Sequence, residues 1–280
     1  MSKLLIGIKN ASYLAGGNFI TQVITLVGFI YIARMLGPDD YGIYVTVGAF
    51  VGIFDILLLS GLSKTVVREG SKDLFSMHVS LEKTIGVRNL LILVAIVVCI
   101  ISSFFTPYEF QTRLYIIIFS SRFVYDGLRE FLETIYQTTE KMQYISIFGI
   151  VDRILFVSLS IIFLYLGFGL LALFLIALFS SLSTLLINYK VSKKFVKFNF
   201  FSKIQIDKNL LKPALVFSLL GFFGFLISRI DLLMISFLGT AKDVGIYGVA
   251  NKIAHQGIML RNFTATAFFP IFVNGFTIKQ

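Results

Sequence analysis

Five charged residues lie close together between Arg122 and Glu133, in a segment with apolar flanks: Arg122, Asp126, Arg129, Glu130 and Glu133. At about 100° per residue of an α-helix, all five fall on one helical face. Arg122 can reach Asp126 and Arg129 can reach Glu133, because both pairs have i,i+4 spacing. The pattern predicts either a ladder of ion pairs that holds helices together or the polar wall of a wet cavity.

Other apolar segments carry ionisable or polar residues as well. Each ionisable residue costs several kcal/mol in a hydrocarbon environment unless it faces protein or water. So many charges on so many segments favour a shared water-filled space over private pairs. The residues are Asp55, Asp152, Arg153, Arg229, Asp231, Asn251, Lys252 and Arg261.

The residue types indicate which chemistry such a cavity could support. A guanidinium in a low-dielectric cavity binds phosphate oxygens in bidentate fashion, so anionic headgroups are its natural ligands. The carboxylates could balance these cations or exchange a proton or Na⁺, and the sequence leaves both roles open. The candidate cavity carboxylates are Asp55, Asp126, Glu130, Glu133, Asp152 and Asp231.

The elements that position these residues are predicted to be transmembrane helices. Hydrophobic residues make up 57% of the 280 residues and charged residues 14%, and the mean hydropathy is +0.88. The apolar residues form blocks of about 20, the length that a helix needs to cross a bilayer. We predict an all-α polytopic membrane protein with about eight transmembrane helices, at 12–36, 42–62, 87–105, 114–136, 144–166, 168–188, 214–238 and 245–273.

The positions of Lys and Arg predict the orientation of these helices, because basic loops stay on the cytoplasmic side. The two longest links, 63–86 and 189–213, are the most basic, whereas the opposite side carries only Arg34, Arg113 and Lys242. We expect a multi-pass protein of the cytoplasmic membrane with both termini in the cytoplasm. Loop bias and attraction to anionic membrane lipids account for the net charge of +10, so no nucleic acid partner is implied.

Several kinds of chemistry find no site in the sequence. Cys99 is the only cysteine, and His78 and His255 are far apart without further ligands at metal-binding spacing. No phosphate-cradling glycine loop and no nucleophile elbow occur. We therefore expect no metal, no cofactor and no enzymatic activity.

An internal repeat divides the chain. The segment at 36–44, Leu-Gly-Pro-Asp-Asp-Tyr-Gly-Ile-Tyr, recurs at 238–247 as Leu-Gly-Thr-Ala-Lys-Asp-Val-Gly-Ile-Tyr. Each copy ends one apolar helix and starts the next, which predicts that the first and seventh helices are equivalent. We expect a first six-helix bundle at 1–190, a basic cytoplasmic linker at 191–213, and the first two helices of an incomplete second bundle at 214–280.

The helix ends resemble those of a known group. The segments 33–42 and 61–69, together with Ser228-Arg229-Ile230-Asp231 and the second repeat, resemble the O-antigen and exopolysaccharide flippases of the MATE-like MOP exporter superfamily. The resemblance implies two six-helix bundles around a central cavity, which alternately opens to either side to move a polyprenyl-diphosphate-linked oligosaccharide across the membrane. Members of that group have more helices than this chain, so the chain looks truncated.

The resemblance also implies roles and partners. Cavity arginines would bind the diphosphate, and here Arg122, Arg229 and Arg261 are the main candidates, with Arg129, Lys252 and Asn251 beside them and Arg34 and Arg68 as lesser ones. The glycosyltransferases and the polymerase of the same pathway are expected partners. Two alternatives stay open: a cation-coupled drug or metabolite antiporter of the same fold, and a non-transporting membrane scaffold in a glycan-assembly complex.

Overall fold

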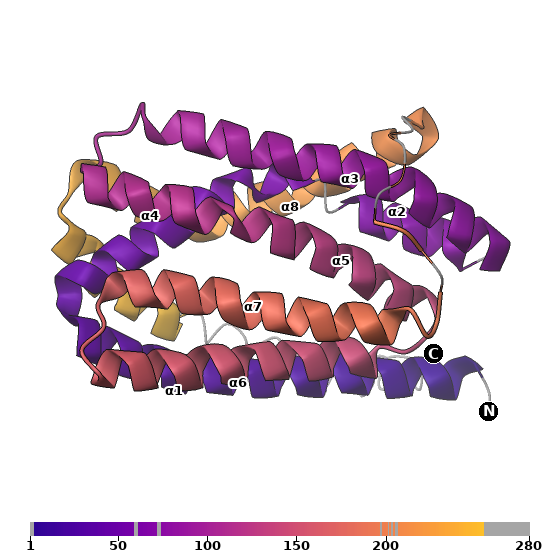
Figure 1. The fold of residues 1–280 in the computed structure, drawn as a ribbon, viewed down its shortest axis with the longest axis horizontal. Helices are drawn as coiled ribbons and strands as arrows, with labels where there is room; N and C mark the ends of the chain where they lie inside the picture. Colours follow the sequence, from indigo (N-terminus) through magenta and orange to yellow (C-terminus); the bar gives the residue numbers. More distant parts are fainter. Residues whose placement is uncertain are drawn as a thin grey trace, which may run out of the picture.

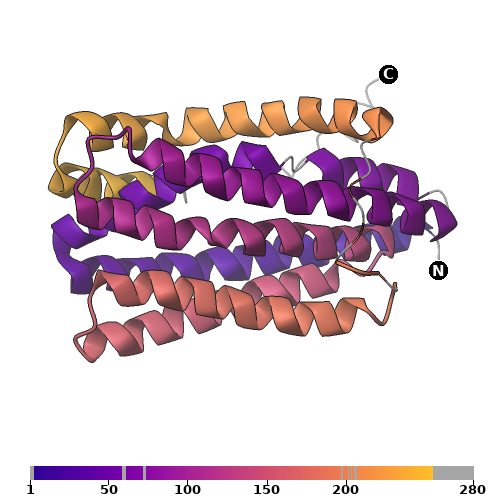
Figure 2. The same cartoon turned by 45° about the horizontal axis from the view of Figure 1, so that its top comes forward.

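A computed structural model describes residues 3–58, 61–71, 74–196, 198–200, 202, 204 and 207–254. All regular structure in these residues is helical, and the helices pack side by side as one bundle (Figures 1 and 2). The elements are α1 (Lys3–Ile53), η1 (Phe54–Leu58, a 3₁₀-helix), α2 (Gly61–Gly70), α3 (Leu74–Ser103), α4 (Phe110–Ser120), α5 (Arg122–Thr138), α6 (Gln143–Tyr165), α7 (Leu170–Ser192) and α8 (Lys208–Leu238). A further helical stretch covers 241–254.

Helix α1 consists of two rods joined at Gly37. This residue has a φ of 75° and a ψ of 174°, a left-handed conformation that only glycine adopts without strain. Pro38 follows it as the first residue of the second rod, where a missing backbone N–H costs nothing. The first two predicted spans therefore correspond to the two rods, and the repeat segment forms the turn between them.

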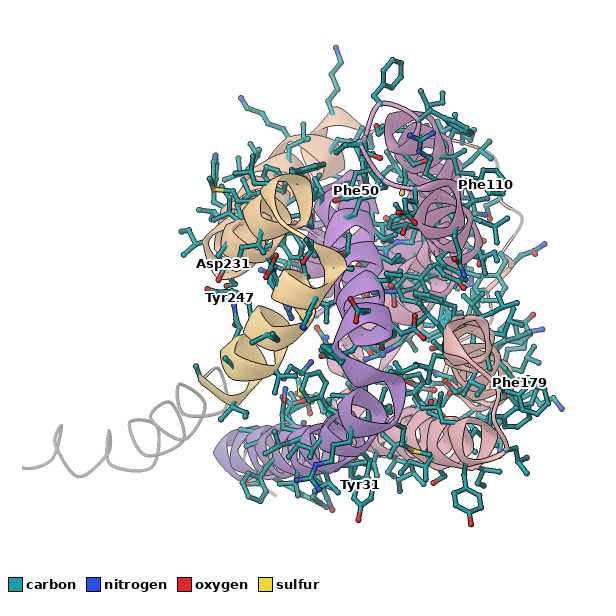
Figure 3. The ribbon with its side chains drawn as sticks, turned by 90° about the vertical axis from the view of Figure 1, so that its left-hand side faces the viewer. Tyr31, Phe50, Phe110, Phe179, Asp231 and Tyr247 are labelled. Carbon is teal, nitrogen blue, oxygen red and sulfur yellow. The ribbon has the colours of Figure 1, made fainter. Side chains whose placement is uncertain are left out.

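The bundle has the surface of a membrane protein. Five helical segments in the described residues are long and apolar enough to cross a bilayer: Lys9–Gly70, which includes most of α1, Met77–Ser103, Gln143–Tyr165, Leu170–Ser192 and Leu210–Leu238. Tyr31, Phe110 and Phe179 lie on the outside and Phe50 inside (Figure 3). Large apolar side chains on the outer surface fit a chain whose solvent is lipid. The prediction of an all-α polytopic membrane protein is confirmed.

The prediction of a loop at 63–86 is wrong. The segment forms α2 and the first turns of α3. Helix α2 buries Leu62, Thr65 and Val66 and exposes Lys64 and Arg68. Hydropathy missed this helix because it is amphipathic and packs against protein rather than lipid.

Other boundaries differ because local turns interrupt the apolar runs. The span expected at 114–136 is two helices, α4 and α5, which follow one another in the same direction with only Ser121 between them (Figure 1). The second rod of α1 ends at Ile53 and continues as η1. Helix α8 starts at Lys208, and the helix expected at 245–273 is described from 241 to 254. The division into two bundles and a linker stays a prediction.

The two copies of the repeat pack on each other reciprocally. A Cβ on Gly42 would overlap the carbonyl group of Ala241, and a Cβ on Gly245 would overlap the carbonyl group of Pro38. Each glycine thus touches the backbone that lies four residues before its counterpart. The two copies therefore form a reciprocal contact between α1 and the helix at 241–254, while the equivalence of the first and seventh predicted helices stays a prediction.

Candidate functional site

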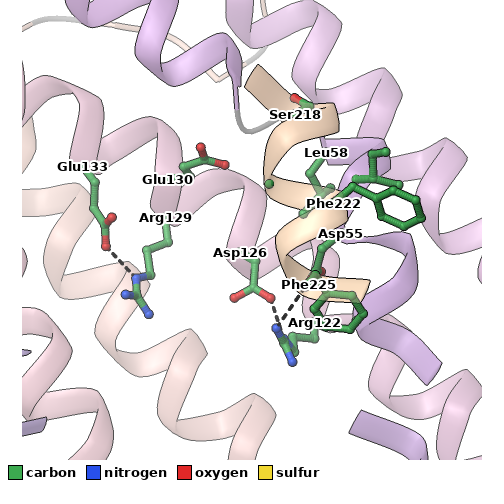
Figure 4. A pocket seen from close by; sticks show the side chains of 13 residues that line it. Asp55, Leu58, Arg122, Asp126, Arg129, Glu130, Glu133, Ser218, Phe222 and Phe225 are labelled. Carbon is green, nitrogen blue, oxygen red and sulfur yellow. Dashed lines mark hydrogen bonds and ion pairs between the residues drawn. The ribbon is translucent and has the colours of Figure 1, made fainter. Parts of the chain in front are cut away.

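The predicted charged face of α5 exists and is paired along the helix. Arg122 Nε donates a hydrogen bond to Asp126 Oδ2, and Arg129 Nε donates one of 2.7 Å to Glu133 Oε1 (Figure 4). Both pairs have the i,i+4 spacing that the sequence indicated. The ladder of ion pairs, one of the two interpretations of this pattern, is therefore present.

Asp55 joins this ladder from another element. The 3₁₀-helix η1 places its Oδ2 atom 3.7 Å from Arg122 Nη2. Its Oδ1 atom is buried and has no hydrogen-bond partner in the described part of the chain. Arg122 therefore stands between the carboxylates of Asp55 and Asp126, while one oxygen of Asp55 remains unsatisfied.

The charged residues border an open space, the second interpretation of the pattern. A cavity of about 400 Å³, here called the acid-rich chamber, lies between η1, α5 and α8 (Figure 4). Its ionisable lining holds more carboxylates than cations: Asp55, Asp126, Glu130 and Glu133, against Arg122 and Arg129. Ser218, Phe222 and Phe225 of α8 complete the wall on the other side.

Arg88 of α3 supports this chamber from behind, although no pattern in the sequence pointed to it. Its side chain is 1% exposed. The Nη1 atom donates to Gly127 O at 2.9 Å and to Glu130 Oε2 at 3.2 Å, and Nη2 donates to Ser63 Oγ at 2.8 Å. Arg88 therefore ties α2, α3 and α5 together and holds Glu130 on the chamber wall.

A second space, here called the cationic chamber, adjoins the first. It has a volume of about 260 Å³, and its cations come from four helices: Arg122 of α5, Arg153 of α6, Arg229 of α8 and Lys252 of the stretch at 241–254. Among the described residues that line it, Asp55 alone carries a carboxylate. Gly52, Asp55, Arg122 and Phe225 line both chambers, so these residues form the boundary between them.

Three of these cations have no acidic partner in the part of the chain that the structure describes. Within the described ranges, Arg153, Arg229 and Lys252 form no ion pair with a carboxylate. Arg153 lies over the Phe156 ring and Lys252 over the Phe29 ring, with 5.9 and 5.1 Å from the charged group to the ring centroid. Cation–π contacts orient a cation without neutralising it. The cationic chamber therefore keeps positive charge available for an anionic ligand.

The predicted site residues fall into three groups. Those that line the two chambers are Asp55, Arg122, Asp126, Arg129, Glu130, Glu133, Arg229 and Lys252. Asp231, Asn251 and Asp152 line neither, and Arg34 and Arg68 are exposed. Arg261 lies outside the described residues. Arg153 also lines the cationic chamber, although the sequence analysis did not assign it a binding role. Its position inside an apolar segment was the signal that could have identified it.

The residues outside the chambers have local partners. Asp231 Oδ2 accepts hydrogen bonds from Tyr247 Oη and, at 2.8 Å, from Asn251 Nδ2, on the side of the molecule seen in Figure 3. Asp152 Oδ1 accepts one from Thr184 at 3.1 Å. These contacts join neighbouring helices and do not face the two large cavities.

A helical bundle with an outer apolar surface and internal cavities lined by ionisable residues defines a multi-pass membrane protein, and solved structures share its fold. An inward-facing multidrug resistance MATE family transporter of the MOP superfamily aligns with a TM-score of 0.65 at 17% identity, covering 85% of this chain and 59% of that one. The MATE multidrug transporter DinF-BH gives 0.65 at 16% identity, with coverages of 90% and 60%.

A third similar structure is a MOP superfamily transporter from Pyrococcus furiosus, for which reverse polarity of the binding pocket suggests a different function. It aligns with a TM-score of 0.60 at 17% identity, covering 87% of this chain and 62% of that one. The chain thus spans about three fifths of the length of these structures. No curated protein matches the sequence significantly.

The sequence profile of the family described as "Polysaccharide biosynthesis protein" matches residues 8–276, nearly the whole chain. The protein belongs to this family. The predicted resemblance to MATE-like membrane proteins of polysaccharide synthesis is therefore confirmed.

Proposed function

We propose that the protein is a flippase, which moves a polyprenyl-diphosphate-linked oligosaccharide across the cytoplasmic membrane for the synthesis of a cell-surface polysaccharide. The action would be transport by alternating access rather than catalysis. Family membership supports the link to polysaccharide synthesis, and the MATE-like fold supports transport.

One observation carries the choice of substrate. The cationic chamber holds Arg153, Arg229 and Lys252 without acidic partners in the described chain, and Arg122 stands at its edge. Uncompensated cations in a low-dielectric cavity are costly, and a ligand with several negative oxygens would offset that cost. A diphosphate group fits this requirement, whereas a cationic drug would be repelled.

The surroundings of the substrate follow from the same proposal. The lipid tail would remain in the bilayer while the polar end occupies the chambers. The basic segments at 63–86 and 189–213 would face the cytoplasm, together with both termini. Glycosyltransferases and a polymerase of the same pathway would supply the lipid-linked oligosaccharide and consume it.

The test is export of the polysaccharide in a strain that lacks its own flippase. Arg229→Ala and Arg153→Ala each remove a charge-assisted contact to phosphate, worth roughly 1.5–3 kcal/mol, so export should fall by about tenfold or more. The amount of each variant in the membrane should stay at the original level, because neither arginine holds an ion pair in the described structure.

Arg113→Ala is the matched control. This arginine donates a hydrogen bond from Nη2 to Thr106 O and lines neither chamber. Export should be unchanged in this variant. Undiminished export in both Arg153→Ala and Arg229→Ala would contradict the diphosphate-binding role.

A further inference from the structure

We propose that the two chambers divide the substrate by charge, with the diphosphate in the cationic chamber and the sugars next to it in the acid-rich chamber. The second placement restricts those sugars to uncharged or amino sugars and excludes uronic acids. The inference rests on the proposed function, because it assigns the other end of the same ligand.

First, both cations that line the acid-rich chamber form ion pairs with carboxylates. Arg129 is paired with Glu133 at 2.7 Å, and Arg122 is shared between Asp126 and Asp55. Behind the wall, Arg88 forms an ion pair with Glu130. An additional carboxylate in this space would therefore meet no free cation among the described residues.

The second step is what the walls of this chamber offer a ligand. Ionised carboxylates only accept hydrogen bonds, and sugar hydroxyl or amino groups donate them. Asp55 Oδ1 is a buried acceptor without a donor in the described chain, so it requires one from a ligand or water. The rings of Phe222 and Phe225 offer apolar surface for the C–H face of a sugar. A uronate would add negative charge beside four carboxylates.

The third step is the connection between the chambers. Arg122 and Phe225 line both, so one ligand can extend from one chamber into the other without crossing a wall. Among the cations that line the two chambers, only Arg153, Arg229 and Lys252 have no acidic partner in the described chain. The ligand then has one orientation, with its diphosphate beside Arg153, Arg229 and Lys252 and its sugars beside Glu133.

The experiment measures the affinity of the full chain in lipid nanodiscs for three soluble probes by titration calorimetry. The first probe is citronellyl diphosphate. The second and third carry a sugar on that diphosphate, N-acetylglucosamine in the second and glucuronic acid in the third. Citronellyl diphosphate should bind, and the N-acetylglucosamine probe should bind at least as tightly. The glucuronic acid probe should bind with an affinity at least about tenfold lower than that of the N-acetylglucosamine probe. Like charges at close range in a partly desolvated site cost this much or more.

A variant tests the cause of this discrimination. Glu133→Gln keeps the shape of the side chain but releases Arg129 from its ion pair. The affinity for the glucuronic acid probe should therefore rise about tenfold, and the preference for the N-acetylglucosamine probe should shrink. Glu82→Gln is the matched control, because Glu82 is an exposed carboxylate on α3, beside His78 and outside both chambers. It should leave all three affinities unchanged.

Two results would overturn the inference while leaving the proposed function in place: equal affinity for the neutral and acidic sugar probes, or no effect of Glu133→Gln on the acidic one. Absence of binding by citronellyl diphosphate itself would overturn the proposed function together with this inference. The diphosphate probe thus separates the two failures.

Discussion

Arg88 joins three helices through a single guanidinium. It contacts Ser63 of α2, and Gly127 and Glu130 of α5, from its own position on α3. A buried charge whose partner is removed is strongly destabilising, because the remaining charge stays desolvated. The residue therefore acts on the chamber through Glu130, which it positions.

Substitution of Arg88 tests this role. Arg88→Met should lower the stability of the purified protein by roughly 1–3 kcal/mol, because Gly127 O and Ser63 Oγ lose their donor and the partly exposed Glu130 loses its charged partner. The double variant Arg88→Met/Glu130→Gln should recover part of this loss. Thermal unfolding in detergent measures both variants.

Arg68→Met is the control for this experiment. Arg68 pairs with its neighbour Glu69, but its side chain is 59% exposed. Exposed pairs contribute little, so the melting temperature should stay near its original value. Equal losses for the Arg68 and Arg88 variants would argue against a specific role of the buried guanidinium.

At the scale of the elements, α1 and the helix at 241–254 contact each other through the two repeat segments. Gly42 and Gly245 approach the opposite backbone so closely that no side chain fits between them. Backbone cannot move aside as a flexible side chain can. The spacing of these two elements is therefore set by the absence of a side chain at two positions that the sequence already marks as equivalent.

A methyl group at Gly42 should separate these elements. A Cβ there would overlap the carbonyl oxygen of Ala241, so Gly42→Ala must displace one helix and should cost roughly 1–3 kcal/mol. Gly16→Ala, also on α1, meets no atom within 4 Å and should be neutral or slightly stabilising. Melting temperatures in detergent compare the two, and a neutral Gly42→Ala would contradict the close contact.

At the scale of the whole molecule, the cavities form where helices from the beginning, middle and end of the described chain meet. The cationic chamber takes residues from α1, η1, α4, α5, α6, α8 and the stretch at 241–254. Uncompensated cations in such a space require water when no ligand is bound. We therefore expect the assembled bundle to hold water in this chamber.

Thiol labelling measures that hydration. In a Cys99→Ser background, Lys252→Cys should react with water-soluble methanethiosulfonates, and the anionic sulfonatoethyl reagent should react faster than the cationic trimethylammonium one, because Arg153 and Arg229 remain nearby. Cys99 itself is buried and should stay unlabelled in the original protein. A slower reaction with the anionic reagent would contradict the positive character of the chamber.

The sequence alone determined the parts that depend on neighbouring residues. The length of the apolar runs predicted the membrane spans, and the i,i+4 spacing predicted the pairs Arg122–Asp126 and Arg129–Glu133. The repeat predicted two equivalent turns. These features follow from helix geometry and from the cost of charge in lipid, which act within a single segment.

Only the tertiary structure decided which charges stay free. Arg88, Arg153 and Arg229 are chemically alike in the sequence, yet the first is paired with Glu130 and the other two line a chamber without an acidic partner in the described chain. The same holds for Asp231, which meets Tyr247 and Asn251 instead of a cavity. Pairing is settled by which helix faces lie opposite each other, and residues distant in sequence fix that arrangement through packing.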